Sequence, residues 1–142
     1  MKNQTVRTLF VVVLFCFALT GMASAQNQIL VRANVPFDFV AQGKTFSAGQ
    51  YVISRLHSEL LGIRHAKSME VTLLSESPVG GGSVQSQSKI VFHRYGDRYF
   101  LAQVWTSGDS YGSGLHKSEE EKRLEKSQTE SRLVAVTIPA SN

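Results

Sequence analysis

The chain has 142 residues, with 15 basic and 11 acidic side chains and a formal net charge of +4. Residues 26–142, the expected exported domain, hold 13 basic and 11 acidic residues, so their excess charge is only +2. This near balance gives no basic patch of the kind that binds nucleic acid or an anionic membrane. The single cysteine, Cys16, precedes this domain, which therefore has neither disulfides nor thiol chemistry.

The first 25 residues have the three parts of a secretory signal peptide. Lys2 and Arg7 precede an unbroken apolar run over residues 9–19, and Ala23-Ser24-Ala25 forms a cleavage site. A membrane anchor is the alternative, but a spanning helix needs about 20 apolar residues. We therefore expect cleavage after Ala25, a periplasmic or extracellular location, no remaining transmembrane helix, and one β-rich domain over residues 26–142.

The strongest strand pattern lies at the start of this domain. Apolar residues occupy every odd position from Ile29 to Phe39, which is the period of two expected of a half-buried strand. Pro36 cannot donate a ladder hydrogen bond, so the strand is either an edge there or broken into two pieces. Residues 42–44, Gln-Gly-Lys, then predict a turn.

Three further short strands are predicted over residues 51–56, 60–65 and 69–73. Polar turns at residues 57–59 and 66–68 separate them, at a spacing of roughly ten residues. No strand alternates with a long helical pattern, which disfavours a parallel α/β sheet. The pattern predicts an all-β fold, either an antiparallel β-sandwich or a partly open β-barrel, with one short C-terminal helix.

Two stretches rich in Gly and Ser, Ser75 to Ser88 and Ser107 to Gly114, are predicted to be flexible loops. We expect them to open before any strand, because they contain little apolar surface to bury. A phosphate-binding loop is excluded for the first stretch, because no Gly-Lys-Ser/Thr follows its glycines.

Residues 89–106 predict a central hairpin around a type II′ turn at Gly96-Asp97. One face then pairs Arg94 with Tyr99, Phe92 with Leu101, and Ile90 with Gln103. The other face pairs His93 with Phe100, Val91 with Ala102, and Lys89 with Val104. Both faces are mostly apolar, which favours a hairpin buried on both sides. A three-residue loop is the alternative, and it would shift this register by one.

The C-terminal part predicts a short helix followed by a strand. Ser118 and Glu121 have the spacing of a capping box, in which each side chain bonds the other's backbone. Glu119 and Arg123 are placed to pair at i, i+4. The helix is expected to dock on the sheet through Leu115 and Leu124, because a helix this short is marginal alone. Residues 133–138, LVAVTI, predict a buried strand that ends before Pro139.

The sequence predicts no catalytic, cofactor-binding or metal site. The four histidines, at positions 57, 65, 93 and 116, lack the spacing of a compact metal site. His57 and His65 flank a possible hairpin and are placed to approach one another, although two surface histidines are the more common case. His93 with Asp97 is conceivable as a base and its orienting acid, but Asp97 is an ordinary turn residue.

Aromatic and basic residues gather near the hairpin turn and in the following loop. The candidate contact surface consists of Arg94, Tyr95, Arg98 and Tyr111. Aromatic rings beside arginines can stack on bases or sugars. Cross-strand packing of Arg94 over Tyr99 is the competing and favoured interpretation.

Four segments carry a resemblance to a known group: VPFDF at 35–39, AGQY at 48–51, FHRYGDRYFLAQVW at 92–105 and LHKSEEEKRL at 115–124. In these the chain resembles small exported acidobacterial proteins of unknown function. The resemblance covers most of residues 26–142 and implies export. It implies no activity, cofactor or site residue.

The sequence therefore favours a non-enzymatic exported domain of the cell envelope with a binding or scaffolding role. Its partner is unknown, whether an envelope protein, a glycan or a small apolar ligand. A barrel-type carrier of a small apolar ligand is the first alternative. An unrecognised envelope hydrolase is the second.

The exported protein should begin at Gln26, because Ala23 and Ala25 provide the small residues that a signal peptidase requires. Intact-mass spectrometry of protein recovered from the cell envelope checks this. A mass that still includes residues 1–25 would contradict the prediction.

Overall fold

The computed structural model describes residues 27–127 and 132–137, so the predicted signal peptide and Pro139 lie outside the described residues. Ten strands and one helix are defined within those ranges. They are β1 (Gln28–Val35), β2 (Phe39–Ala41), β3 (Lys44–Phe46), β4 (Gly49–His57), β5 (Leu60–His65), β6 (Thr72–Gly80), β7 (Lys89–Tyr95), β8 (Arg98–Trp105), β9 (Tyr111–Leu115), α2 (Glu119–Ser127) and β10 (Arg132–Thr137). The predicted β-rich fold with a short C-terminal helix is confirmed.

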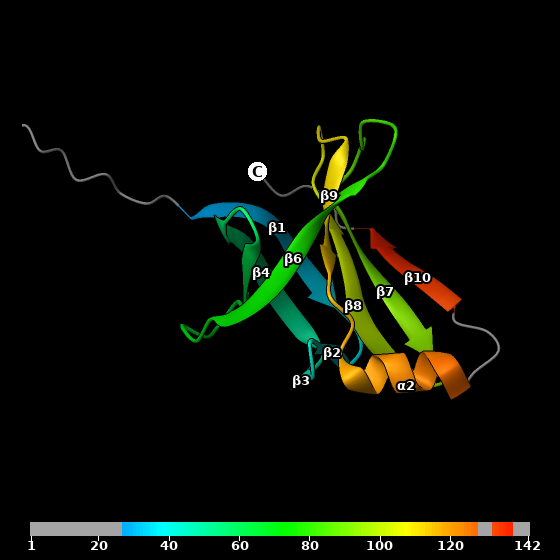
Figure 1. Ribbon diagram of the computed structural model, residues 1–142. Helices are drawn as coiled ribbons and strands as arrows, with labels where there is room; N and C mark the ends of the chain where they lie inside the picture. Colours follow the sequence, from blue (N-terminus) through cyan, green and yellow to red (C-terminus); the bar gives the residue numbers. More distant parts are fainter. Residues whose placement is uncertain (1–26, 128–131, 138–142) are drawn as a thin grey trace, which may run out of the picture.

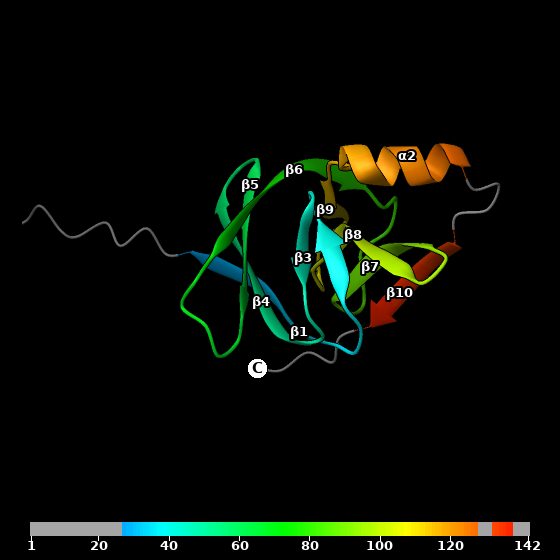
Figure 2. The same cartoon turned by 90° about the horizontal axis from the view of Figure 1, so that it is seen from below.

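The strands form one bent sheet whose two halves face each other. Neighbouring strands run β1-β4-β5-β6-β9-β8-β7-β10, and the β2–β3 hairpin joins the edge of β8 beside β9. Figure 2 shows β1, β4 and β5 on one side of the molecule and β7, β8 and β10 on the other. All strand pairs are antiparallel except β2 with β8, which makes the sheet mixed. The strands that the structure describes do not close into a barrel.

Strand β6 belongs to both halves and crosses between them (Figure 1). Its first part, up to Ser75, pairs with β5, and its second part, from Glu76 to Gly80, pairs with β9. The prediction of a loop over Ser75–Gly80 is therefore wrong. Among the described strands, this part of β6 pairs only with β9. Pro78 is tolerated there, because a proline on an edge can direct its missing N–H away from the paired strand.

The space between the two halves is filled by one apolar core. Phe39 and Phe92 lie at its centre with ring centroids 5.4 Å apart, and Tyr51 from the opposite half meets Phe39 edge-on at 5.2 Å. The other buried members include Val31, Ala33, Val35, Phe46, Ile53, Leu61, Ile63, Leu74, Ile90, Leu101 and Val104. Phe39, Phe92 and Ile53 are among the largest side chains that are fully buried there.

Pro36 divides the first predicted strand into two pieces, which is one of the two alternatives that the sequence predicted. β1 ends at Val35 and β2 begins at Phe39. The period of two fails only at the start of β1, where a bulge between Ile29 and Val31 leaves Ile29 exposed and buries Leu30. The turn at residues 42–44 is confirmed, with positive φ at Gln42 and Gly43.

The β7–β8 hairpin has the predicted turn. Gly96 has a φ of 61° and Asp97 does not have a positive φ, which is the pattern of a type II′ turn. The predicted pairs Arg94–Tyr99, His93–Phe100 and Phe92–Leu101 are confirmed.

Beyond Phe92 the predicted register is wrong by one residue, because a bulge in β8 leaves Ala102 without a partner. The expected pairs Ile90–Gln103, Val91–Ala102 and Lys89–Val104 are replaced. The observed pairs are Ile90–Val104, Val91–Gln103 and Lys89–Trp105. The shift brings Ile90 and Val104 together in the core and places the Lys89 ammonium 5.4 Å from the Trp105 ring centroid.

Both faces of the hairpin are covered, as predicted. One face packs into the core, and α2 lies against the other near the turn (Figure 1). Leu124 of α2 packs on Val40, Tyr95 and Phe100, while Leu115 packs on the main core. The predicted C-terminal strand is present as β10, but it pairs only with β7 among the described strands and so lies at an edge rather than in the centre.

The second predicted loop is also partly wrong, because Tyr111–Leu115 form β9. The remaining loop residues, 81–88 and 106–110, are hydrogen-bonded to one another. Gly81 donates to the Ser110 carbonyl, Gln85 donates to the Asp109 carbonyl, and Gly108 donates to the Gln85 carbonyl, each at 2.9 Å. The two loops therefore brace each other.

Truncating Phe92 or Phe100 to alanine should lower the free energy of unfolding by about 3–5 kcal/mol. Both rings are buried, with exposed fractions of 0% and 1%, so each change leaves a cavity. Total stability is roughly 5–15 kcal/mol for a domain of this size. Urea unfolding measures the loss. Tyr111→Ala is the control, because that ring is 68% exposed. Parent-like midpoints for both Phe variants would refute the assignment.

Candidate functional site

The predicted contact surface is not brought together by the fold. Arg94, Tyr95 and Arg98 flank the hairpin turn, whereas Tyr111 begins β9, beyond the opposite end of β8. Tyr95 is only 2% exposed and packs beneath α2, so it contributes no contact surface. Arg98 forms a two-pronged ion pair with Glu120 of α2. The Arg94 guanidinium lies 5.4 Å from the Tyr99 ring centroid, which is the cross-strand packing that the sequence favoured.

A buried acid attaches α2 to the hairpin. The Ser118 hydroxyl accepts a hydrogen bond from the Glu121 N–H at 3.2 Å, which confirms half of the predicted capping box. The Glu121 side chain does not return to Ser118, because its Oε1 lies 2.6 Å from Nδ1 of His93. The expected Glu119–Arg123 side-chain pair is replaced by Glu119–Lys122 at 2.7 Å.

The His93–Glu121 pair resembles a general base and its orienting acid. The sequence offered Asp97 as that acid, but in the structure Glu121 has this position. Asp97 is fully exposed in the turn, as expected. Among the described residues, the only side-chain hydrogen bond of His93 is the one to Glu121. The geometry therefore supports a role of the pair in docking α2 on the hairpin.

Glu121 and Glu125 also affect the buried Tyr95. Burial raises the pKa of the Tyr95 phenol to about 12, and the two carboxylates add to the rise by disfavouring a second negative charge. Lys117 has the opposite effect on Glu125, because its hydrogen bond lowers the pKa of that carboxyl group.

His57 and His65 do not meet. His57 is opposite Leu60 at the turn of the β4–β5 hairpin, and His65 is opposite Tyr51 at its other end. Within residues 27–127 and 132–137, no three His, Cys, Asp or Glu side chains are grouped to hold a metal ion. Over the same described ranges, no helix is long and apolar enough to cross a membrane.

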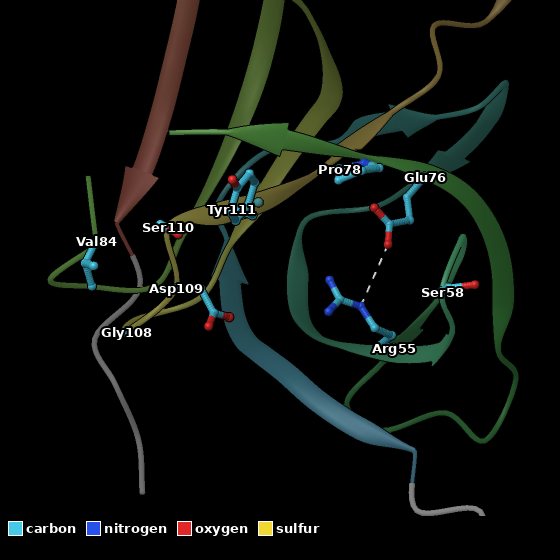
Figure 3. A pocket seen from close by; sticks show the side chains of 10 residues that line it. Arg55, Ser58, Glu76, Pro78, Val84, Gly108, Asp109, Ser110 and Tyr111 are labelled. Carbon is cyan, nitrogen blue, oxygen red and sulfur yellow. Dashed lines mark ion pairs between the residues drawn. The ribbon is translucent and has the colours of Figure 1, made fainter. Parts of the chain in front are cut away.

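A pocket of about 470 Å³ is lined by residues of β4, β6 and the start of β9, and of the loops at residues 81–88 and 106–110. This volume falls within the range of small-molecule sites. Figure 3 shows Arg55, Ser58 and Glu76 on one side and the segment from Gly108 to Tyr111 on the other. The lining residues are Arg55, Ser58, Glu76, Pro78, Val84, Gly108, Asp109, Ser110, Tyr111 and Gly112.

The alternation of β6 places its side chains in this pocket. Leu74 is in the core, and Glu76, Pro78 and Gly80 follow it at intervals of two, so they occupy the same face. On β9, Ser113 is opposite Pro78 and Tyr111 is opposite Gly80. The core face of the sheet therefore continues directly into the pocket.

Arg55 and Glu76 form a partly satisfied ion pair at the base of the pocket. Arg55 Nε lies 3.8 Å from Glu76 Oε1, and Arg55 Nη2 donates to Ser113 Oγ at 2.9 Å. Glu76 is only 4% exposed, yet its Oε2 has no hydrogen-bond partner, and neither does Arg55 Nε. Both atoms are closed off from solvent, so a molecule in the pocket reaches the ion pair only at its accessible edge, chiefly the Arg55 side chain, which is 40% exposed.

Tyr111 forms the rim of the pocket. Its ring lies over Gly80, where a Cβ atom would come 3.7 Å from Cε1, and the side chain is otherwise exposed. Gly112 beside it is required by a close approach, because a Cβ atom there would lie 2.6 Å from the Trp105 ring. The Trp105 indole N–H donates to Gln103 Oε1 at 2.9 Å, which fixes the ring beneath the rim.

Sequence reasoning named Tyr111 but missed Arg55 and Glu76. Glu76 was hidden in a stretch predicted to be a loop. A signal was present nonetheless: Arg55 falls on the same face as Tyr51 and Ile53, and Glu76 on the same face as Leu74. A charged residue on an inward-facing strand position is a candidate functional residue, since charges are rarely buried without a partner.

Comparison with known proteins found no matching family model, no matching curated protein and no matching solved structure. The resemblance to acidobacterial exported proteins therefore stays a prediction.

Replacing Tyr95 with phenylalanine should remove part of the alkaline loss of stability. The phenol loses its proton near pH 10 when unfolded and near pH 12 when folded, so the unfolded state binds fewer protons between these values. Stability should be fully present below about pH 10 and fall as pH rises, by up to about 2–3 kcal/mol.

Urea unfolding of the parent and the Tyr95→Phe variant from about pH 9 to pH 11.5 measures this slope. The pKa of Tyr51 is also raised, chiefly by burial, but Tyr51 is present in both proteins, so its effect cancels in the comparison. Equal slopes would show that Tyr95 does not remain protonated in the folded state.

Proposed function

We propose that the protein is a non-enzymatic, exported binding domain whose ligand site is the pocket around Arg55 and Glu76. The supporting observation is the incomplete ion pair that lines the pocket: Arg55 Nε lies 3.8 Å from Glu76 Oε1, and the Arg55 side chain is 40% exposed. A polar ligand that bonds the accessible edge of this pair would gain hydrogen bonds to charged groups, which contribute about 1.5–3 kcal/mol each.

The pocket favours a binding role over a scaffolding role alone, because hydrogen bonds between two loops hold one of its walls in place. The loops that form the far wall share three backbone hydrogen bonds, and Ser107 adds bonds to Ser86 and Ser88. A preorganised site loses less conformational entropy when a ligand binds.

The two alternatives have less support. A carrier of a small apolar ligand needs an apolar cavity, but the centre is filled by Phe39 and Phe92, and the pocket contains Arg55, Glu76 and Asp109. A hydrolase needs an activated nucleophile, and the one His–Glu pair of the described residues lies beneath α2 at the other end of the hairpin.

The test replaces both charged residues of the pair, so that a loss of ligand binding can be measured without a loss of folding stability. In the double variant Arg55→Met, Glu76→Leu, apolar side chains replace a partly satisfied ion pair whose acid is buried and whose arginine is 40% exposed. Such replacements are often neutral or stabilising by about 1–4 kcal/mol. We expect an unchanged or higher free energy of unfolding in urea, together with loss of the ligand.

Ligand is measured by native mass spectrometry of parent and variant purified from their own cell envelope. NMR titration with the small-molecule fraction of an envelope extract locates the binding. A ligand bound by the parent at residues 55, 76 and 111–113, and not by the variant, supports the proposal. It is wrong if neither method detects a ligand in the parent, or if the variant binds it equally well.

A further inference from the structure

We infer that the pocket takes a neutral sugar, with a hydroxyl group between Arg55 and Glu76 and the sugar ring against Tyr111. This inference rests on the proposed function and specifies the chemistry of the ligand. It follows from three features of the pocket: the incomplete Arg55–Glu76 ion pair, the balance of charge, and the exposed face of one aromatic ring.

The two partners of the ion pair have opposite requirements. The Arg55 guanidinium, on a side chain that is 40% exposed, only donates hydrogen bonds, whereas the Glu76 carboxylate only accepts them. A hydroxyl group does both, and adjacent hydroxyl groups of a sugar present a donor and an acceptor side by side. Ser58, Asp109 and Ser110 add polar groups around the same space for further hydroxyls.

The charges in the pocket disfavour an ionic ligand. Glu76 and Asp109 contribute two carboxylates against one guanidinium, so a phosphate or a carboxylate would meet net negative charge. An amino acid that placed its ammonium near Glu76 would place its carboxylate at Arg55. Because Arg55 Nε lies only 3.8 Å from Glu76 Oε1, that carboxylate would also lie beside the carboxylate of Glu76. A neutral hydroxyl bonds both the guanidinium and the carboxylate without bringing another charge into the site.

Tyr111 supplies the apolar surface that such a ligand also needs. One side of its ring rests on Gly80, and the side chain as a whole is 68% exposed at the rim. A flat aromatic face accepts the C–H face of a pyranose, while hydroxyls at the edge of the sugar remain free to reach Glu76 and Arg55. Pro78 lies between Glu76 and Gly80 on the same strand face and extends this apolar surface.

The experiment is an NMR titration of the processed protein with named sugars. The panel is glucose, galactose, mannose, maltose and cellobiose, with glycine, glutamate and inorganic phosphate as charged controls. We expect at least one sugar to shift the amides of residues 55, 76 and 111–113. Glu76→Gln should weaken that binding by about ten- to a hundredfold, because a hydrogen bond to a charged acceptor is lost.

Tyr111→Ala should weaken the same binding by about tenfold. This residue is exposed, so the variant tests the inference even if Glu76→Gln fails to fold. The matched control is Leu73→Ala, which truncates a 58% exposed side chain on β6, the strand of Glu76, outside the pocket. It should leave sugar affinity unchanged.

The outcomes separate this inference from the proposed function. If a charged control shifts the pocket amides and no sugar does, the sugar inference is wrong and the proposed function stands. Sugar shifts confined to the hairpin turn, or equal losses for Tyr111→Ala and Leu73→Ala, would also overturn the inference. If neither the panel nor the envelope extract shifts any pocket amide, both proposals are wrong.

Discussion

The structure depends on the place where β6 exchanges one partner strand for another. Ser75 is the last residue of β6 opposite β5, where it faces Leu60, and it is exposed. The Gln42 side chain bonds its backbone: its Nε2 donates to the Ser75 carbonyl at 2.5 Å, and its Oε1 accepts from the Ser75 N–H at 3.0 Å. The next N–H, of Glu76, donates to the Glu59 carbonyl at 3.0 Å. One strand can therefore serve both halves of the sheet.

This exchange also determines where the core ends and the pocket begins. Leu74 is opposite Leu61 in the core, and two residues later Glu76 is opposite Leu115 on the other half. Arg55 reaches it from β4, where it follows Ile53 on the inward face. An ion pair with a buried acid seldom adds stability over apolar residues of similar volume, and this one leaves two atoms unpaired. Folding stability alone therefore does not explain the pair.

Local sequence signals predicted the parts of the fold that depend on near neighbours. The type II′ turn at Gly96, the break at Pro36 and the cap at Ser118 each follow from the residues beside them. The errors came from distant partners. Gly and Ser composition predicted loops where β6 and β9 pair across more than thirty residues. The bulge at Ala102 and the turning of Glu121 toward His93 were likewise set by packing that no local pattern contains.

The two ends of the β7–β8 hairpin differ in how their outer surface is covered. At the turn, α2 covers Tyr95 and Phe100, and the His93–Glu121 bond fixes it there. At the other end, Trp105 lies beneath two glycines, since a Cβ atom at Gly81 or Gly112 would come within 2.7 Å of its ring. No side chain at those positions covers the indole, so the loops themselves lie on it and hydrogen-bond to each other. The rim of the pocket is thereby positioned by the core, and a ligand would meet Tyr111 and Glu76 already in place.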